Sequence, residues 1–217
     1  MQPQPPAVRP PLDQRSFPLP DARLIVIATS AGGLIAIGRV LAALPVDFPA
    51  AIAIVQHRGL QHPELLPELL GKWTALPVRH ARSGEVFTAG VVYVCPPGMH
   101  MTVEHCVRLV EEPRINAVRP SADLMLRSAA RNYGERSIGV VLSGTGRDAA
   151  LGCLAIAQAG GTVIVQEASS CEFPGMPGAA AQLVPTELVL PPEQIGPLLL
   201  QLVAGRPLAR RPVVRAA

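Results

Sequence analysis

The sequence predicts an α/β fold: a doubly wound, mostly parallel sheet with helices on both faces and an inserted antiparallel β-hairpin region. Short apolar segments alternate along the chain with segments of helical periodicity, as in repeated β-α-β units. Hydrophobic residues make up 49% of the 217 residues but aromatic residues only 3%, so aliphatic side chains must fill the core. Strands that are buried on both faces of a parallel sheet have this aliphatic character.

The first part of the chain predicts two buried strands, each followed by a helix. Residues 24–28 are uniformly apolar and predict a strand, and residues 33–44 predict the helix after it. Residues 51–56 predict the second strand. The helix predicted over 62–73 should be bent or interrupted at Pro67, because proline removes a helical hydrogen bond.

The segment 78–110 has a different pattern, which predicts β-hairpins attached to the parallel sheet. Its candidate strands are short and alternate apolar with polar residues. Turns are expected at Ser83-Gly84 and at Pro96-Pro97-Gly98. The candidate strands are 78–81, 91–95, 101–103 and 107–110.

The last part of the chain returns to alternating helices and strands. A helix is predicted over 121–133, with Ser121 as its N-cap and Asp123 in its first turn. The closing helix starts at a proline, which suits a first helical position. The remaining predicted elements are a strand over 138–142, a helix over 147–159, a strand over 162–166 and the closing helix over 191–203.

The two ends of the chain differ in composition from the folded part, which we expect to span 22–204. Residues 1–21 hold seven prolines and predict an extended arm, and residues 205–217 form a tail rich in Arg and Pro. The formal net charge of +3 comes from these ends, because 22–204 carries 13 basic and 14 acidic residues. A nucleic-acid partner is therefore not expected, since it would require clustered basic residues with aromatic stacking groups.

Membrane insertion, secretion and metal binding are also not expected. No uninterrupted apolar stretch reaches 18 residues, and the first 20 residues lack the apolar core of a signal peptide, so a cytoplasmic location is predicted. The four cysteines have no C-x-x-C spacing, which predicts reduced, packed thiols and no zinc site. Cys171 lies in a polar run and is kept as an alternative nucleophile.

Three turns at predicted strand ends carry candidate chemistry, since ligands of doubly wound sheets bind beyond the carboxyl ends of the strands. In the first turn Ser30 lies between Ala28 and Gly32, small neighbours that a sharp strand-to-helix turn around a nucleophile requires. The N-terminus of the following helix would offer amide groups to a developing oxyanion. Equally, Ser30 could serve only as a helix N-cap.

The second and third turns supply a candidate base and a candidate acid. His57 follows the second strand and could accept a proton from Ser30, although a single histidine after a strand is a weak signal. Asp148 follows Gly144 and Gly146 and could orient His57, with Asp123 as the competing carboxylate. The chain order Ser, His, Asp differs from the Ser, Asp, His order of α/β-hydrolases.

Together the motifs resemble the catalytic domain of CheB, the protein-glutamate methylesterase of bacterial chemosensory systems. The family's Gly-Ala-Ser-Thr-Gly-Gly turn corresponds to 28–33, its Gln-His pair to 56–57, and its Thr-Gly-Met-Gly-x-Asp-Gly segment to 143–149. The resemblance extends from about residue 24 to 203. Further matches lie at 96–101, which includes His100, at 119–123 and at 173–177.

The resemblance implies a serine hydrolase without metal or organic cofactor. Ser30 would be the nucleophile, His57 the base and Asp148 the acid that orients it. The reaction would release methanol from glutamate γ-methyl esters of a methyl-accepting chemoreceptor or a related signalling protein, and the same chemistry could deamidate glutamine. The implied oxyanion and substrate-binding residues are Ala31, Gly32, Gly33, Thr145 and Gly146.

Several departures from the family pattern affect these expectations. Thr145 replaces a methionine whose backbone N–H is expected in the oxyanion hole, and Ala28 and Ala149 replace glycines. The family's phosphorylatable receiver domain is not expected, because only the proline-rich arm precedes the first strand, so a constitutively accessible site is predicted. A catalytically silent binding module is the alternative function. A nucleotide-binding domain is rejected, since the chain lacks G-x-x-x-x-G-K-[ST].

Overall fold

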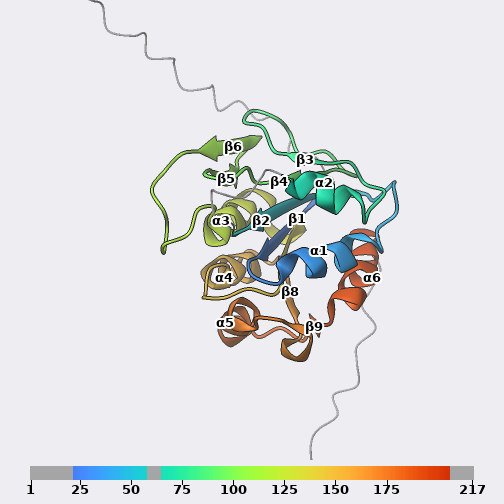
Figure 1. Cartoon of the computed structure of the whole chain (residues 1–217), viewed down its shortest axis with the longest axis vertical. Coiled ribbons are helices and arrows are strands. Elements are labelled where there is room, and N and C mark those ends of the chain that lie inside the picture. The colour runs from blue at the N-terminus through green and yellow to red at the C-terminus, as the bar shows by residue number, and fades with distance from the viewer. Residues whose placement is uncertain (1–21, 58–64, 206–217) are drawn as a thin grey trace, which may run out of the picture.

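A computed structural model describes residues 22–57 and 65–205, which form a parallel sheet between two layers of helices (Figure 1). In the described residues this sheet has seven strands in the order β3-β4-β2-β1-β7-β8-β9, all paired in parallel. A separate antiparallel pair joins β5 to β6. The predicted arm and tail lie outside the described residues, apart from residue 205. The strands are β1 (Arg23–Thr29), β2 (Ala50–Gln56), β3 (Val78–His80), β4 (Val92–Val94), β5 (His100–Val103), β6 (Val107–Val110), β7 (Ser137–Val141), β8 (Thr162–Gln166) and β9 (Val189–Leu190).

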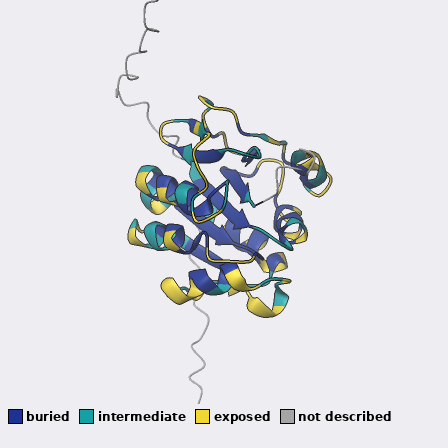
Figure 2. Cartoon of the chain, turned by 60° about the vertical axis from the view of Figure 1, so that its left-hand side comes forward, coloured by how far each residue is buried: buried dark blue, intermediate teal, exposed yellow. Residues whose placement is uncertain are grey.

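The helices bury both faces of the sheet, which explains why its central strands are apolar throughout. Along β1, Leu24 and Val26 belong to one core, whereas Ile25 and Ile27 belong to the other. Figure 2 shows the buried sheet between helices whose outer faces are exposed. The first core is covered by α3 (Ala122–Tyr133), α4 (Ala150–Gln158) and α5 (Gly175–Leu183), the second by α1 (Gly33–Leu41), α2 (Leu66–Gly71) and α6 (Pro192–Val203).

The predicted fold class is confirmed, but the hairpin prediction is right only for β5 and β6. The segments predicted as hairpin strands at 78–81 and 91–95 are β3 and β4, and both pair in parallel within the main sheet. Val92, Tyr93 and Val94 are all buried, so β4 is an interior strand rather than a half-exposed one. Alternation over three or four residues does not distinguish these two arrangements.

The helices differ from prediction mainly at their starts. The helix α2 begins at Leu66 with Pro67 in its first turn, so proline starts this helix instead of bending it; residues 62–64 lie outside the described part. The helix α4 begins at Ala150, after Ala149 adopts a φ of 89° in the left-handed region that favours glycine. Neither α5 nor β9 was predicted, because α5 is rich in Gly, Pro and Ala and β9 has two residues.

The strand order places a topological switch point at β1. Its neighbours are β2 on one side and β7 on the other, with Thr29 opposite Gln56 and Ala28 opposite Val141. The loops that leave β1, β2 and β7 therefore start side by side at the carboxyl edge of the sheet, where such folds bind ligands. Among residues 22–57 and 65–205, no helix is both long and apolar enough to cross a membrane.

Candidate active site

Ser30 lies on a tight turn between β1 and α1 that its backbone holds in place. Its N–H donates to the carbonyl of Ser143 over 3.0 Å, and its carbonyl accepts from the Gly33 N–H over 3.2 Å. A Cβ at Gly33 would lie 1.8 Å from Thr29 Oγ1, so only glycine fits there. Gly32 has a φ of 71° and precedes α1. The backbone thus fixes Ser30, a residue that remains only partly buried.

The loop after β7 packs directly against this turn through Gly144. The Gly144 N–H donates to the carbonyl of Phe173, and its carbonyl accepts from the Met176 N–H, each over 2.8 Å. A Cβ on Gly144 would lie 2.4 Å from Met176 Sδ and 2.9 Å from Ser30 Cβ. The absence of a side chain at Gly144 therefore allows the two loops to meet at Ser30.

Replacing Gly144 with Ala is expected to destabilise the protein and to displace Ser30. Overpacking of this kind costs about 1–3 kcal/mol, and here the backbone of the nucleophile turn must shift as well. Gly178→Ala in α5 is the control, because a Cβ there meets nothing within 4 Å. Thermal unfolding should show a lower Tm for the Gly144 variant and no loss for the control. Equal Tm values for both variants would contradict the steric argument.

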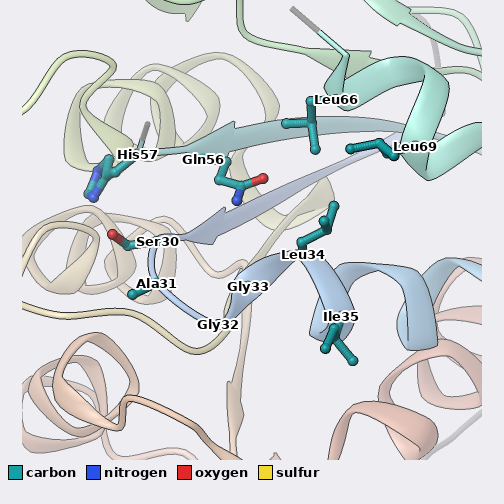
Figure 3. A pocket seen from close by; sticks show the side chains of 10 residues that line it. All are labelled: Ser30, Ala31, Gly32, Gly33, Leu34, Ile35, Gln56, His57, Leu66 and Leu69. Atoms are coloured by element: carbon teal, nitrogen blue, oxygen red, sulfur yellow. The ribbon is translucent and has the colours of Figure 1, made fainter. Parts of the chain in front are cut away.

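His57 follows β2 and faces both Ser30 and Asp148. Its backbone N–H donates to the carbonyl of Thr29 over 3.0 Å, which holds the ends of β1 and β2 together. The ring Nε2 lies 2.8 Å from Asp148 Oδ2, and both side chains are largely buried. Figure 3 shows the Ser30 hydroxyl facing the His57 ring. Because Asp148 occupies Nε2, Nδ1 is the ring nitrogen left to accept a proton.

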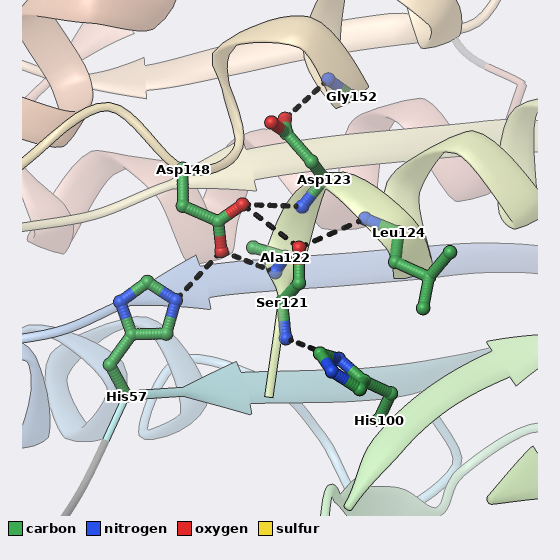
Figure 4. A network of polar contacts seen from close by, with 8 residues as sticks. All are labelled: His57, His100, Ser121, Ala122, Asp123, Leu124, Asp148 and Gly152. Carbon is green, nitrogen blue, oxygen red and sulfur yellow. Dashed lines mark hydrogen bonds and ion pairs between the residues drawn. The ribbon is translucent and has the colours of Figure 1, made fainter. Parts of the chain in front are cut away.

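Asp148 accepts four hydrogen bonds, two on each carboxylate oxygen (Figure 4). Besides His57, the Ala122 N–H donates to Oδ2 over 2.6 Å, while the Ser121 hydroxyl and the Asp123 N–H donate to Oδ1 over 3.0 Å each. Burial alone would raise the pKa of Asp148, but the hydrogen bonds from His57 and the two amides lower it below its ordinary value. The carboxylate therefore stays ionised, on the positive end of the α3 dipole.

The competing carboxylate, Asp123, has a different role. Its Oδ1 accepts from the Gly152 N–H over 2.7 Å and so joins α3 to α4. Burial raises the pKa of Asp123, against the Gly152 bond, and the nearby Asp148 charge raises it further. Asp148, not Asp123, contacts His57. Ser121 acts as the predicted N-cap, accepting from the Leu124 N–H over 3.4 Å, but its second bond to Asp148 has no local sequence signal.

An open pocket of about 550 Å³ lies beside Ser30 (Figure 3). Ser30, Gln56, His57 and the turn residues Ala31, Gly32 and Gly33 form its polar side. Leu34, Ile35, Leu66 and Leu69 of α1 and α2 form its apolar side. Thr145 and Gly146, the other residues expected to bind the oxyanion, lie in the exposed loop after β7 and do not line this pocket.

Among the described residues, neither the cysteines nor clusters of metal-ligating side chains form a second site. All four cysteines are free, and none lines the pocket. Burial raises the pKa of Cys95 and of Cys153 to about 12 and also raises that of Cys171, so these thiols are poor sources of thiolate. In the described part of the chain, no cluster of three or more His, Cys, Asp or Glu side chains could hold a metal ion.

Comparison with known proteins shows the family of this chain. Residues 25–199 match the family model described as CheB methylesterase. A protein-glutamate methylesterase/protein-glutamine glutaminase of Caulobacter vibrioides is 39% identical over 200 residues, which are 89% of this chain and 57% of that protein. The protein-glutamate methylesterase FrzG of Myxococcus xanthus is 39% identical over 188 residues, covering 86% of this chain and 56% of that protein.

A solved structure matches over nearly its whole length. The crystal structure of the Thermotoga maritima CheB methylesterase catalytic domain superimposes with a TM-score of 0.81 at 33% identity, covering 84% of this chain and 99% of that domain. The chain thus spans little more than half the length of the curated relatives it matches, but nearly the whole of this solved domain. By sequence and by structure, this chain belongs to the CheB methylesterase family.

Proposed function

We propose that this chain is a serine esterase that demethylates glutamate γ-methyl esters on chemoreceptor-like signalling proteins and releases methanol. The observation that carries the proposal is the convergence of three side chains from separate loops. Ser30 faces His57, and His57 Nε2 lies 2.8 Å from an Asp148 carboxylate that three further donors hold in place. Nucleophile, base and orienting acid are the three parts that acyl transfer of this type requires.

The first half of the reaction would acylate Ser30. The Ser30 oxygen attacks the ester carbonyl carbon while His57 Nδ1 takes the hydroxyl proton, and Asp148 stabilises the resulting imidazolium through Nε2. The tetrahedral intermediate then collapses. The bond to the methoxy oxygen breaks, His57 returns the proton to that oxygen, and methanol leaves. A γ-glutamyl ester of Ser30 remains.

The second half would hydrolyse this ester. Water attacks the acyl carbon and gives its proton to His57 Nδ1; the bond to Ser30 then breaks and Ser30 recovers the proton. The products are a glutamate side chain and free enzyme. With a glutamine side chain, the first leaving group would be ammonia instead of methanol, and the names of several relatives include this glutaminase activity.

The oxyanion would be stabilised by backbone amides at the start of α1 and in the loop after β7. We assign this role to the turn residues Ala31 and Gly32 and to the loop residues Thr145 and Gly146. Within the described part of the chain, the amides of Gly32 and Thr145 have no hydrogen-bond partner and are free to donate. The Gly33 amide already donates to Ser30, so Gly33 shapes the turn instead. Because the donor at Thr145 would be its backbone N–H, the replacement of the family's methionine by threonine does not remove it.

The test of this proposal is methanol release from methylated cytoplasmic fragments of chemoreceptors. We expect methanol to be released with a matching loss of methyl groups, and ammonia from fragments that carry glutamine at the same sites if deamidation occurs. Labelling of Ser30 by a fluorophosphonate probe separates an esterase from a silent binding module. No methanol release by a protein that also resists the probe would contradict the proposal and favour the binding module.

The partner and the location follow from the same proposal. A protein partner suits residues 22–204, whose acidic and basic residues nearly balance, better than a nucleic acid does. Chemoreceptor fragments that carry methylation sites would be reached from the cytoplasm, and we assign the protein to that compartment. The catalytic unit would be 22–204, which contains the family match and all three proposed catalytic residues.

Replacing the half-buried Cys171 with Ser should leave ester hydrolysis within about twofold of the unmodified protein, because serine keeps a small hydrogen-bonding side chain at a position outside the pocket. The Cys171 thiol donates to the carbonyl of Glu167 over 3.4 Å and lies outside the pocket that Ser30 lines. Steady-state methanol release measures the effect, with the Tm as a check of folding. A selective loss of turnover in a folded Cys171 variant would revive the thiol as the nucleophile.

A further inference from the structure

His100, outside the proposed triad, is fully buried at the start of β5 and has a hydrogen bond on each ring nitrogen. Nδ1 accepts from the Ser121 N–H over 3.1 Å, and Nε2 lies 3.0 Å from the carbonyl oxygen of Pro113. A backbone N–H can only donate and a carbonyl can only accept. His100 is therefore neutral, with its proton on Nε2 and a bare Nδ1 toward Ser121.

The amide that His100 holds belongs to the residue from which the support of Asp148 begins. Ser121 is fully buried and extended, with φ −106° and ψ 125°, and it caps α3. The Ser121 hydroxyl and the next two amides, of Ala122 and Asp123, supply three of the four hydrogen bonds to Asp148. The orientation of the Ser121 peptide thus sets the direction of every donor to Asp148 except His57 (Figure 4).

We propose that His100 is a positioning residue for the proposed esterase reaction: by accepting from the Ser121 N–H, it holds the first turn of α3 in the orientation that fixes Asp148 against His57. This inference rests on the proposed function. It deepens that function by extending the catalytic support from Asp148 through Ser121 to a second histidine. His100 itself touches neither Ser30 nor the pocket beside it.

The arrangement explains why a histidine, not just any acceptor, stands at this position. Its second nitrogen donates to Pro113, in the segment that leads from β6 to α3. His100 therefore links two points of that segment, at Pro113 and at Ser121, to the start of β5. A side chain with only an acceptor keeps the contact with Ser121, whereas a side chain with only a donor keeps the contact with Pro113.

Two substitutions separate these contacts. In His100→Asn the Asn Oδ1 replaces Nδ1 and can accept from Ser121, while the donor toward Pro113 is lost. In His100→Gln the Gln Nε2 replaces the ring Nε2 and can donate to Pro113, while the acceptor for Ser121 is lost. His105→Gln is the matched control, because His105 is exposed in the turn between β5 and β6.

We expect His100→Gln to lower kcat at least about tenfold with KM nearly unchanged, since the proton transfer is impaired and the pocket is not. His100→Asn should keep most of the activity, and His105→Gln all of it. The rate of fluorophosphonate labelling of Ser30 should follow the same order. Activities are compared between variants at temperatures where each is fully folded, as judged by thermal unfolding. If kcat falls in both His100 variants in proportion to the decrease in their Tm, His100 has a merely structural role, and the proposal is overturned.

A spectroscopic readout makes the test independent of the substrate. The proton between His57 Nε2 and Asp148 should give a downfield NMR signal, assigned by its loss in His57→Gln. It should shift or broaden in His100→Gln and persist in His100→Asn. If the wild-type protein hydrolyses p-nitrophenyl acetate but not methylated receptor fragments, the proposed substrate is wrong. The His100 proposal is then tested by the kcat for p-nitrophenyl acetate and by the NMR signal of the proton between His57 and Asp148. An unchanged signal and unchanged kcat in His100→Gln would refute the His100 proposal alone.

Discussion

Replacement of Ser30 with Ala is expected to abolish methyl-ester hydrolysis, with a loss of about 10⁴-fold or more in kcat, because removing one member of a triad costs nearly as much as removing all three. The fold should be unaffected. The contacts that hold the turn are made by the Ser30 backbone, to Ser143 and Gly33, and these remain in the variant. Ser30 is only partly buried, so the loss of its hydroxyl removes little packing.

The measurement combines steady-state methanol release with thermal unfolding. Ser169→Ala is the control, since Ser169 is exposed on the short turn after β8 and does not line the pocket. The Ser30 variant should unfold at the same Tm as the control and fail to react with a fluorophosphonate. Retained hydrolysis in the Ser30 variant would eliminate Ser30 as the nucleophile, whatever its stability.

The central strands of the sheet and the turns at their carboxyl ends could be predicted, because the sequence patterns that indicate them are local. Five apolar residues at 24–28 predict a buried strand, and a Ser between small residues directly after it predicts a tight turn. The parallel pairing of β3 and β4 could not be predicted in this way. Three residues in each strand carry too little periodicity. The interior position of β4, between β3 and β2, and the burial of its side chains in both cores depend on residues distant in the chain.

The same distinction applies to the candidate site. Ser30, His57 and Asp148 each follow a predicted strand, so the edge rule for doubly wound sheets brings them together. The support of Asp148 is different, because its donors come from the first turn of α3, 25 to 27 residues earlier in the chain. Ser121 and Asp123 had local explanations, as a cap and as a first-turn acid. No local pattern indicated that the same turn also binds a loop carboxylate.

The Asp148→Asn variant should lose about 10³- to 10⁴-fold in kcat, because an asparagine NH₂ group that faces His57 holds the ring in the wrong tautomer. Each carboxylate oxygen of Asp148 accepts two hydrogen bonds. The side-chain amide of the asparagine can take two orientations, and in each of them its NH₂ group faces donors instead of acceptors. If that group faces His57, Nε2 must accept, and the proton then sits on Nδ1, where the base is needed. If it faces Ser121, the Asp123 amide loses its acceptor.

The same variant should also be less stable by about 1–3 kcal/mol, the cost of leaving a buried donor unsatisfied. Because the pKa of Asp148 is lowered in the folded protein, its ionised form stabilises the fold at every pH above the ordinary value of 3.8, and this contribution is lost as the pH falls through the folded pKa. The difference in unfolding free energy between wild type and Asp148→Asn should therefore stay constant from neutral pH down to about 4 and shrink only below that. Denaturant unfolding over this range measures it, with Asp47→Asn, an exposed position, as the control. A difference that already shrinks near neutral pH would show that Asp148 is not held ionised, and a variant with full turnover would remove Asp148 from the proposed triad.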